Sequence, residues 1–309
     1  MTKLRFPAIL PLAGILAFAC SSTAAPPKAS GLLSWRGPDQ TGALPGKGYP
    51  DTWGGPEGEN HLWTHKVKGG GTPVIANGKL YAFGYYDNPK DLSDVQEALI
   101  CLDPQTGELE WEYRFSDFIS DVVYNRYAVG SPIVDAETGN VYLQSSNGRL
   151  MAFTADGKQL WEHSLVEKLA RLTFPNGRTG SLGLQGPVVI VHCVTANWGT
   201  TGPARDRLYA FDKITGELVW YSTPGTVPDD SSFSMPVYAT IDGHRVGYTG
   251  HGCGIISSGD MRTGKPLWRF QFAKGGVNSQ ILKYGEDKII AIHGKENVDT
   301  TAKGRLICL

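Results

Sequence analysis

The sequence predicts an all-β protein built from repeated four-stranded antiparallel units, and three observations support this prediction. A segment of similar residues recurs, as LICLDPQTGELEWEYRF over residues 99–115 and LYAFDKITGELVWYSTP over residues 208–224. The tryptophans at 63, 111, 161, 220 and 268 are spaced 48, 50, 59 and 48 residues apart. Thirty-nine glycines and 19 prolines suit short strands joined by turns rather than helices. A repeat of this period indicates a repeat architecture.

The N-terminal segment predicts export. Lys3 and Arg5 precede an apolar stretch, residues 6–19, that is too short for a membrane span and is broken by prolines. We therefore interpret residues 1–19 as a signal peptide. Cys20 follows Ala-Phe-Ala, which suits ordinary secretion and also resembles a bacterial lipoprotein, in which Cys20 would carry the lipid. Residues 20–30 are predicted to be a flexible tether, and residues 31–60 an extended lead-in that runs across the surface.

Residues 61–309 carry the repeat, and each unit offers four short strands. In the second unit these are SPIVD from Ser131, NVYLQS from Asn140, RLMAFT from Arg149 and QLWEHSL from Gln159. Apolar residues alternate with polar ones, and turn residues separate the segments. Units of about 50 residues with four strands each predict a β-propeller with about five blades in this chain.

The residues of the repeated turn have a structural interpretation. An Asp can accept hydrogen bonds from the turn backbone, a Gly can take positive φ, and the Trp can bury its ring between neighbouring blades. We therefore assign a structural role, and no chemistry, to Asp103, Gly107, Trp111, Trp161, Asp212, Gly216, Trp220, Asp260, Gly264 and Trp268.

The pattern Asp-x-x-Thr-Gly-x-x-x-Trp resembles the repeat of the PQQ-like β-propellers, which include quinoprotein alcohol dehydrogenases and the BamB-type outer-membrane assembly lipoproteins. The copies at Asp103–Trp111 and Asp212–Trp220 match fully, and the copy ending at Trp268 keeps the spacing. The copy ending at Trp161 is shorter. The resemblance covers about 250 residues and implies the fold, but catalysts and scaffolds share the motif. Such propellers have seven or eight blades, so the ring is expected to be incomplete and the chain to be a fragment. The alternative is a five-bladed ring closed by residues 61–67.

Strand order sorts the connections onto two faces. The short repeated turns fall on one face, and the long irregular loops, including residues 84–98 and 192–207, fall on the other. Binding residues commonly lie on loops that a rigid scaffold holds, so we predict that the loop-rich face is functional. Its candidate residues are Tyr124, Arg126, Tyr127, Asn176, Arg178, Asp229, Asp230 and Asn278.

The charge, the cysteines and the histidines of the sequence argue against nucleic-acid binding, disulfides and a metal site. The formal net charge is -1, which gives no electrostatic footprint for nucleic acid. Cys101 and Cys308 are predicted to be buried free thiols, and no bridge is predicted between Cys193 and Cys253. The histidines at 192, 251 and 293 end corresponding strands in successive units, and we predict ordinary polar residues rather than metal ligands.

Two functions from different classes remain. The favoured one is non-catalytic: an exported, lipid-anchored scaffold that binds a protein or polysaccharide partner in the bacterial envelope, with no cofactor and no catalytic residue. Outer-membrane protein assembly is one version. The alternative implied by the resemblance is a PQQ-dependent dehydrogenase with calcium, acting on alcohols or sugars, although the chain lacks the vicinal cysteine pair of those enzymes. A carbohydrate hydrolase or lyase would need converging carboxylates, which Asp121, Asp229 and Asp230 indicate only faintly.

Overall fold

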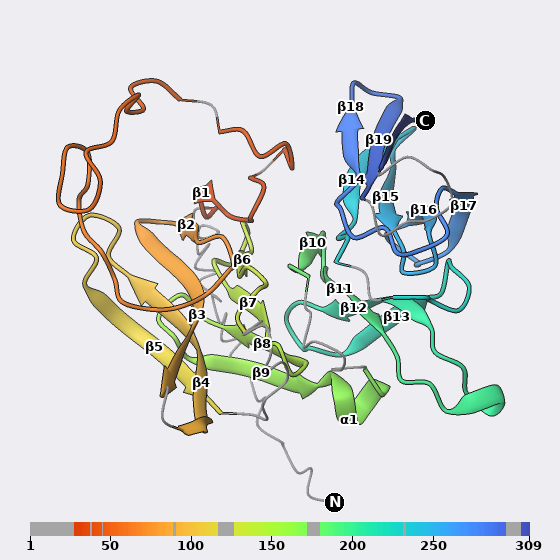
Figure 1. Ribbon diagram of the computed structural model, residues 1–309, viewed down its shortest axis with the longest axis horizontal. Coiled ribbons are helices and arrows are strands. Elements are labelled where there is room, and N and C mark those ends of the chain that lie inside the picture. Colours follow the sequence, from red (N-terminus) through yellow and green to blue (C-terminus); the bar gives the residue numbers. More distant parts are fainter. Residues whose placement is uncertain are drawn as a thin grey trace, which may run out of the picture.

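The computed structural model describes residues 28–309 apart from residues 38, 45, 89–90, 117–126, 172–179, 231–232 and 295–303. Within these residues the chain forms 20 strands, one short α-helix and one 3-10 helix. The strands make five antiparallel sheets, which we call blades 1 to 5 in chain order. Figure 1 shows the blades as an arc with their first strands toward the middle. The predicted β-propeller class is confirmed, and the blades do not close into a ring.

The strands of each blade pair in chain order, from the inner edge outward. Blade 1 contains β1 (Gly31–Leu32), β2 (Val74–Ala76), β3 (Lys79–Asn88), β4 (Asp91–Leu102) and β5 (Leu109–Phe115). Blade 2 contains β6 (Ile133–Val134), β7 (Val141–Gln144), β8 (Arg149–Phe153) and β9 (Gln159–Ser164). Blade 3 contains β10 (Gly183–Gln185), β11 (Val188–Val194), β12 (Asp206–Asp212) and β13 (Leu218–Ser222). Blade 4 contains β14 (Val237–Ile241), β15 (His244–Gly250), β16 (Ile255–Asp260) and β17 (Pro266–Gln271). Blade 5 contains β18 (Leu282–Tyr284), β19 (Lys288–His293) and β20 (Arg305–Cys308).

The repeated turn joins the third and fourth strands of a blade. In blade 3, Asp212 Oδ1 accepts the backbone N–H groups of Ile214 and Thr215, each at 2.8 Å. Gly216 then takes φ +75°, a conformation that is strained for residues with a Cβ. Blades 1 and 4 repeat this arrangement at Asp103 and Asp260. The turn therefore stabilises itself with local hydrogen bonds and returns the chain directly into the next strand.

The repeat tryptophans of blades 1 to 3 join consecutive blades, whereas Trp268 of blade 4 departs from the prediction, being 41% exposed with its ring beside Tyr248 of the same blade. The ring of Trp161 in blade 2 lies against Gly216 in blade 3, and its indole N–H donates to the Lys213 carbonyl at 3.2 Å. Trp111 makes the equivalent hydrogen bond to Ala155 of the following blade. The hydrophobic core is accordingly divided among the blade interfaces, and one cluster joins blade 2 to blade 3 through Tyr142, Tyr209 and their neighbours. Each blade is thus stabilised mainly by its neighbours.

The first part of the lead-in departs from the predicted course across the surface, whereas the described residues of 41–60 are almost all exposed. β1 pairs with the inner edge of β2, with Gly31 opposite Ala76. The Val134 N–H of blade 2 donates to the Leu33 carbonyl at 2.9 Å, and Gln40 Oε1 accepts the Tyr238 N–H of blade 4 at 2.8 Å. Residues 29–40 therefore lie on the inner side of the arc. The physical reason is that inner strands offer unpaired backbone groups, which an extended segment satisfies.

One connection of blade 1 also differs from expectation. The segment of blade 1 predicted as an irregular loop, residues 84–98, forms the outer part of the β3–β4 hairpin, with Tyr85 opposite Glu97. The connection that follows blade 2 contains the short helix α1 (Leu165–Leu169), where Ser164 Oγ accepts the Glu167 N–H at the N-terminus.

The five-bladed alternative is not what the structure shows. It would require residues 61–67 to complete blade 5, yet this segment lies on blade 1, where Trp63 and Val67 pack against Ile100. In the described part of blade 5, β20 pairs only with β19. Cys101, Cys193 and Cys253 are buried free thiols, whereas Cys308, predicted to be buried, is exposed on β20, which among the described residues is an edge strand.

Candidate functional site

The long connections lie on one side of the arc. The outer part of the β3–β4 hairpin, α1 and the 3-10 helix η1 (Gly199–Thr201) all fall along the lower edge of the molecule in Figure 1. The short repeated turns join the opposite ends of the strands. The sorting of loops by strand direction therefore holds in the fold, although the hairpin is regular.

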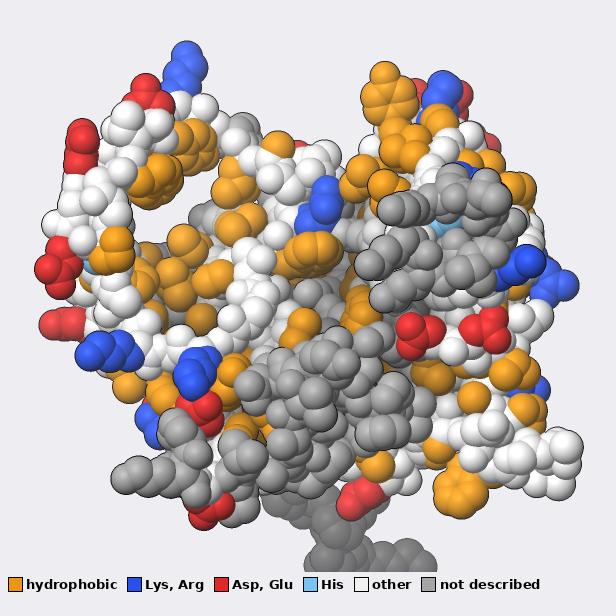
Figure 2. All heavy atoms as spheres, viewed as in Figure 1, with side chains coloured by type: hydrophobic (Ala, Val, Ile, Leu, Met, Phe, Trp, Pro, Cys, Tyr) orange, Lys and Arg blue, Asp and Glu red, His pale blue; other side chains and the backbone are white. Residues whose placement is uncertain are grey.

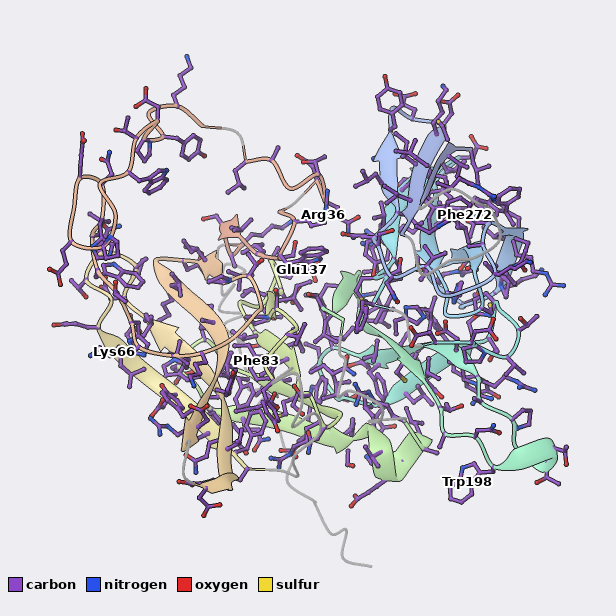
Figure 3. All side chains as sticks on the ribbon, in the orientation of Figure 1. Arg36, Lys66, Phe83, Glu137, Trp198 and Phe272 are labelled. Atoms are coloured by element: carbon purple, nitrogen blue, oxygen red, sulfur yellow. The ribbon has the colours of Figure 1, made fainter. Side chains whose placement is uncertain are left out.

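One loop on this side presents an aromatic residue to solvent. Residues 195–205 connect β11 to β12, and Trp198 within them is 72% exposed, pointing away from the body of the molecule (Figure 3). The Trp198 N–H donates to the Gly202 carbonyl at 2.7 Å, and Thr195 Oγ1 accepts the Arg205 N–H at 2.9 Å. The loop is thus held by its own hydrogen bonds while the indole remains free for contact.

The same loop is attached to α1. The Ala196 N–H donates to the Ala170 carbonyl at 2.7 Å, just beyond the end of the helix. Val166 on α1 is 37% exposed. We call the exposed indole of Trp198, together with the loop that carries it, residues 195–205, the Trp198 surface. Sequence reasoning named the loop but missed Trp198, whose signal was a lone tryptophan among glycines, threonines and asparagine.

The sequence-predicted binding residues are not gathered into one described site. Tyr124, Arg126, Asn176, Arg178 and the proposed lipidation residue Cys20 lie outside the described residues. Tyr127 is buried, and its ring lies 5.3 Å from that of Tyr85. Asp229 is exposed and Asp230 half-buried, and the backbone N–H groups of both point to the Gly252 carbonyl. Asn278 is half-buried in the connection between blades 4 and 5.

A cleft of about 930 Å³ lies on the inner side of the arc, between the lead-in and the first strands of blades 2 to 5. Figure 2 shows a notch at the upper edge of the molecule there, and Figure 3 shows Arg36 and Glu137 beside it. Lys213, Arg245 and Lys283 also line the cleft. Buried Lys213 is bonded to Asp135 at 2.9 Å and to Glu137 at 2.5 Å, so these charges join blade 2 to blade 3.

Two of the three strand-end histidines meet in the interior. His192 Nε2 lies 2.5 Å from Asp206 Oδ1, and His251 Nδ1 lies 3.5 Å from Asp206 Oδ2. All three side chains are buried. His293 is not part of this group, and Asp206 was not singled out in the sequence because it lies in a different strand from either histidine.

The group is strongly coupled electrostatically. Burial alone would raise the pKa of the Asp206 carboxyl, yet the charge and hydrogen bond of His192 hold it well below its usual range. Burial likewise opposes the charged form of His192, but Asp206 raises the pKa of that ring above its ordinary value. For His251 burial prevails, and its pKa is lowered. Asp206 is therefore ionised, and one positive charge is favoured beside it.

The fold and these sites define a class of protein: an arc of antiparallel propeller blades with Asp-Gly turns between their outer strands and tryptophans that contact the next blade. A protein-family model described as "Outer membrane protein assembly factor BamB" matches residues 55–222, and the chain belongs to this family of PQQ-like propellers. A search among curated proteins found no match.

Solved structures with similar folds are PQQ-type dehydrogenases. They include a quinohemoprotein alcohol dehydrogenase from Comamonas testosteroni (18% identity, 78% of this chain and 40% of that chain, TM-score 0.49) and a europium-containing methanol dehydrogenase (16%, 74% and 48%, TM-score 0.52). A third is the quinohemoprotein alcohol dehydrogenase ADHIIG from Pseudomonas putida HK5 (15%, 80% and 39%, TM-score 0.49). The chain spans less than half the length of each. The methanol dehydrogenase likeness supports the fold alone.

The described residues contain no helix with the length and apolar character of a membrane span.

Proposed function

We propose that this chain is a binding scaffold of the bacterial envelope that takes part in outer-membrane protein assembly, and that the Trp198 surface contacts a protein partner. Family membership supports the assembly role. The observation that carries the choice of surface is the exposure of Trp198 on a loop fixed by internal hydrogen bonds.

Two properties of the Trp198 surface, its exposed aromatic ring and its ordered loop, favour it over the rest of the loop-rich face as a binding site. Tryptophan dominates binding energy at many interfaces because one ring removes a large apolar area from water. A loop that is already ordered loses little further entropy on binding.

The test is site-specific photo-crosslinking in the native envelope. A photoreactive side chain at position 198 is expected to form an adduct with a component of the outer-membrane assembly machinery. The matched control is position 53, because Trp53 is 73% exposed but lies on the lead-in. Trp198→Ala is expected to weaken the partner's binding at least tenfold, with unfolding unchanged. Equal adducts from both positions, or adducts with polysaccharide alone, would refute the proposal.

Export and anchoring are part of the same proposal. The signal-like segment and Cys20 support a lipid-tethered protein of the periplasmic side, with no other membrane contact. Labelled fatty acid should be incorporated into the wild-type chain and not into Cys20→Ser. Incorporation into the variant would place the lipid elsewhere and contradict this assignment.

A PQQ-dependent oxidoreductase acting on alcohols or sugars is the second candidate, and the inner cleft is the observation that favours it. Exposed Arg245 and Lys283 line the cleft and would attract a carboxylated ligand. The oxygen ligands that calcium requires fit less well, because Asp135 and Glu137 are bonded to Lys213. Reconstitution with PQQ and calcium, followed by dye reduction with alcohols or glucose, separates the candidates: turnover would overturn the scaffold proposal.

A further inference from the structure

The buried group of His192, Asp206 and His251 spans the interface between blades 3 and 4. His192 lies in β11 and Asp206 in β12, whereas His251 directly follows β15. Asp206 also accepts the Gly252 N–H of blade 4 at 2.6 Å through Oδ2. One ligand atom from each of the three side chains lies within 4.8 Å of the others.

The outer nitrogen of each histidine ring is held by a neighbour. His192 Nδ1 lies 2.6 Å from the Ser234 carbonyl, which can only accept, so this nitrogen carries the proton. His251 Nε2 lies 2.7 Å from Ser257 Oγ, which can accept its proton. Such contacts to the far nitrogen fix the tautomer and orientation of metal-binding histidines. Neutral His192 therefore aims a lone pair at Asp206, and neutral His251 does the same when its Nε2 donates to Ser257.

This arrangement requires positive charge between the side chains. His192 Nε2 faces Asp206 Oδ1 at 2.5 Å, the length of a charge-assisted hydrogen bond, so a proton lies between them in the metal-free chain, and a bound cation would displace that proton and move the two atoms apart. A proton on His192 would satisfy one contact, but His251 Nδ1 is buried and has no hydrogen-bond partner among the described residues. A divalent cation would satisfy both nitrogens and the carboxylate together.

The corresponding interface between blades 1 and 2 shows that joining blades does not need the histidines. Glu97 precedes Leu99 by two residues, as Asp206 precedes Leu208, and it accepts the Ser146 N–H of the next blade at 3.1 Å. Phe83 pairs with Leu99 where His192 pairs with Leu208. Glu97 also accepts the Ala128 N–H at 2.8 Å and the Ser146 hydroxyl, so an interblade carboxylate can be satisfied without histidines, and the two histidines of the second interface are an addition.

We propose that His192 Nε2, Asp206 and His251 Nδ1 bind a zinc-class divalent metal ion that cross-links blades 3 and 4. Two imidazoles and one carboxylate form a donor set that suits zinc and similar transition metals. The 3.5 Å between His251 Nδ1 and Asp206 Oδ2 is close to the roughly 3.4 Å that separates two ligands of a tetrahedral ion with bonds of about 2.1 Å. Because the side chains are shielded from solvent, the ion serves the fold and does not meet a substrate.

The test begins with the wild-type chain. Purified protein equilibrated with Zn²⁺ and desalted is expected to retain about one ion per chain, and Co²⁺ should give the visible absorption of a tetrahedral site. A strong chelator should lower the melting temperature, and Zn²⁺ should restore it. Retention of no zinc, or NMR signals showing His192 with protons on both nitrogens in zinc-treated protein, would overturn the proposal.

Variants then assign the ligands. His251→Gln and Asp206→Asn are expected to weaken Zn²⁺ binding more than tenfold, and Ser257→Ala about 10–100-fold through the lost contact to His251. The matched controls are His293→Gln, which alters another buried histidine, and Glu97→Gln, which alters the equivalent carboxylate of blade 1; both should retain the ion. Equal zinc content in His251→Gln would refute the assignment. If the ligand variants do not fold, the chelator experiment on the wild type still decides.

Discussion

Replacement of Gly216 by Ala tests whether the tryptophans fasten one blade to the next. Gly216 has φ +75°, and a Cβ there would lie 2.7 Å from Cδ2 of Trp161. Positive φ costs a residue with a Cβ about 1–2 kcal/mol. Overpacking of a buried contact adds about 1–3 kcal/mol. The free energy of unfolding should therefore fall by about 2–5 kcal/mol.

Gly139 supplies the matched control for this experiment. It also has φ +75°, but a Cβ there meets nothing within 4 Å. Gly139→Ala should therefore lose only the backbone contribution of about 1–2 kcal/mol. Urea unfolding followed by tryptophan fluorescence measures both variants, and the difference between them isolates the contact with Trp161. Equal losses would show that the ring does not press on this turn, and the account of interblade stapling would be wrong.

Two further predictions concern charge. Lys213→Met should destabilise the chain by about 3–5 kcal/mol in urea unfolding, because it leaves Asp135 buried without its cation. The control Lys288→Met removes an exposed ion pair with Asp287 and should leave the unfolding midpoint unchanged. Equal effects of the two substitutions would contradict this reasoning. Backbone N–H donors, chiefly that of Thr215, lower the pKa of Asp212 in the folded chain. The contribution of Asp212 to the free energy of unfolding is therefore fully present above pH 3.8, the ordinary pKa of the carboxyl, and is lost as the pH falls through its lower pKa in the folded state. Asp212→Asn should therefore show a weaker loss of stability over that acid range in melting curves, and an unchanged acid dependence would argue against the turn hydrogen bonds.

The blades could be predicted from sequence because the information that specifies them is local. Asp, Gly and Trp stand at fixed offsets within a single turn, and that turn contains its own hydrogen bonds. The tryptophan spacing then gives the unit length. The long and short connections could also be sorted, since antiparallel strands alternate in direction.

The course of the lead-in could not be predicted in the same way. Residues 29–40 have no period, and their position depends on unpaired backbone groups of β2, of β6 and of Tyr238. Those groups come from three blades and exist as a surface only after the blades have assembled. Similarly, the β3–β4 extension carries polar residues that read as a loop, although its backbone continues the ladder past Tyr85.

The buried histidine group was hidden for a related reason. The sequence shows His192 and His251 near the ends of corresponding strands in neighbouring units. They do not occupy equivalent positions, because His192 lies within β11 whereas His251 follows β15. The two rings meet because the turn after β15 contacts the preceding blade, where Asp206 accepts the Gly252 N–H. Glu97 makes the same contact to the next blade, with Phe83 in place of His192. Comparison of the two interfaces therefore shows that the fold requires the carboxylate contact and that the histidines are an addition of this chain.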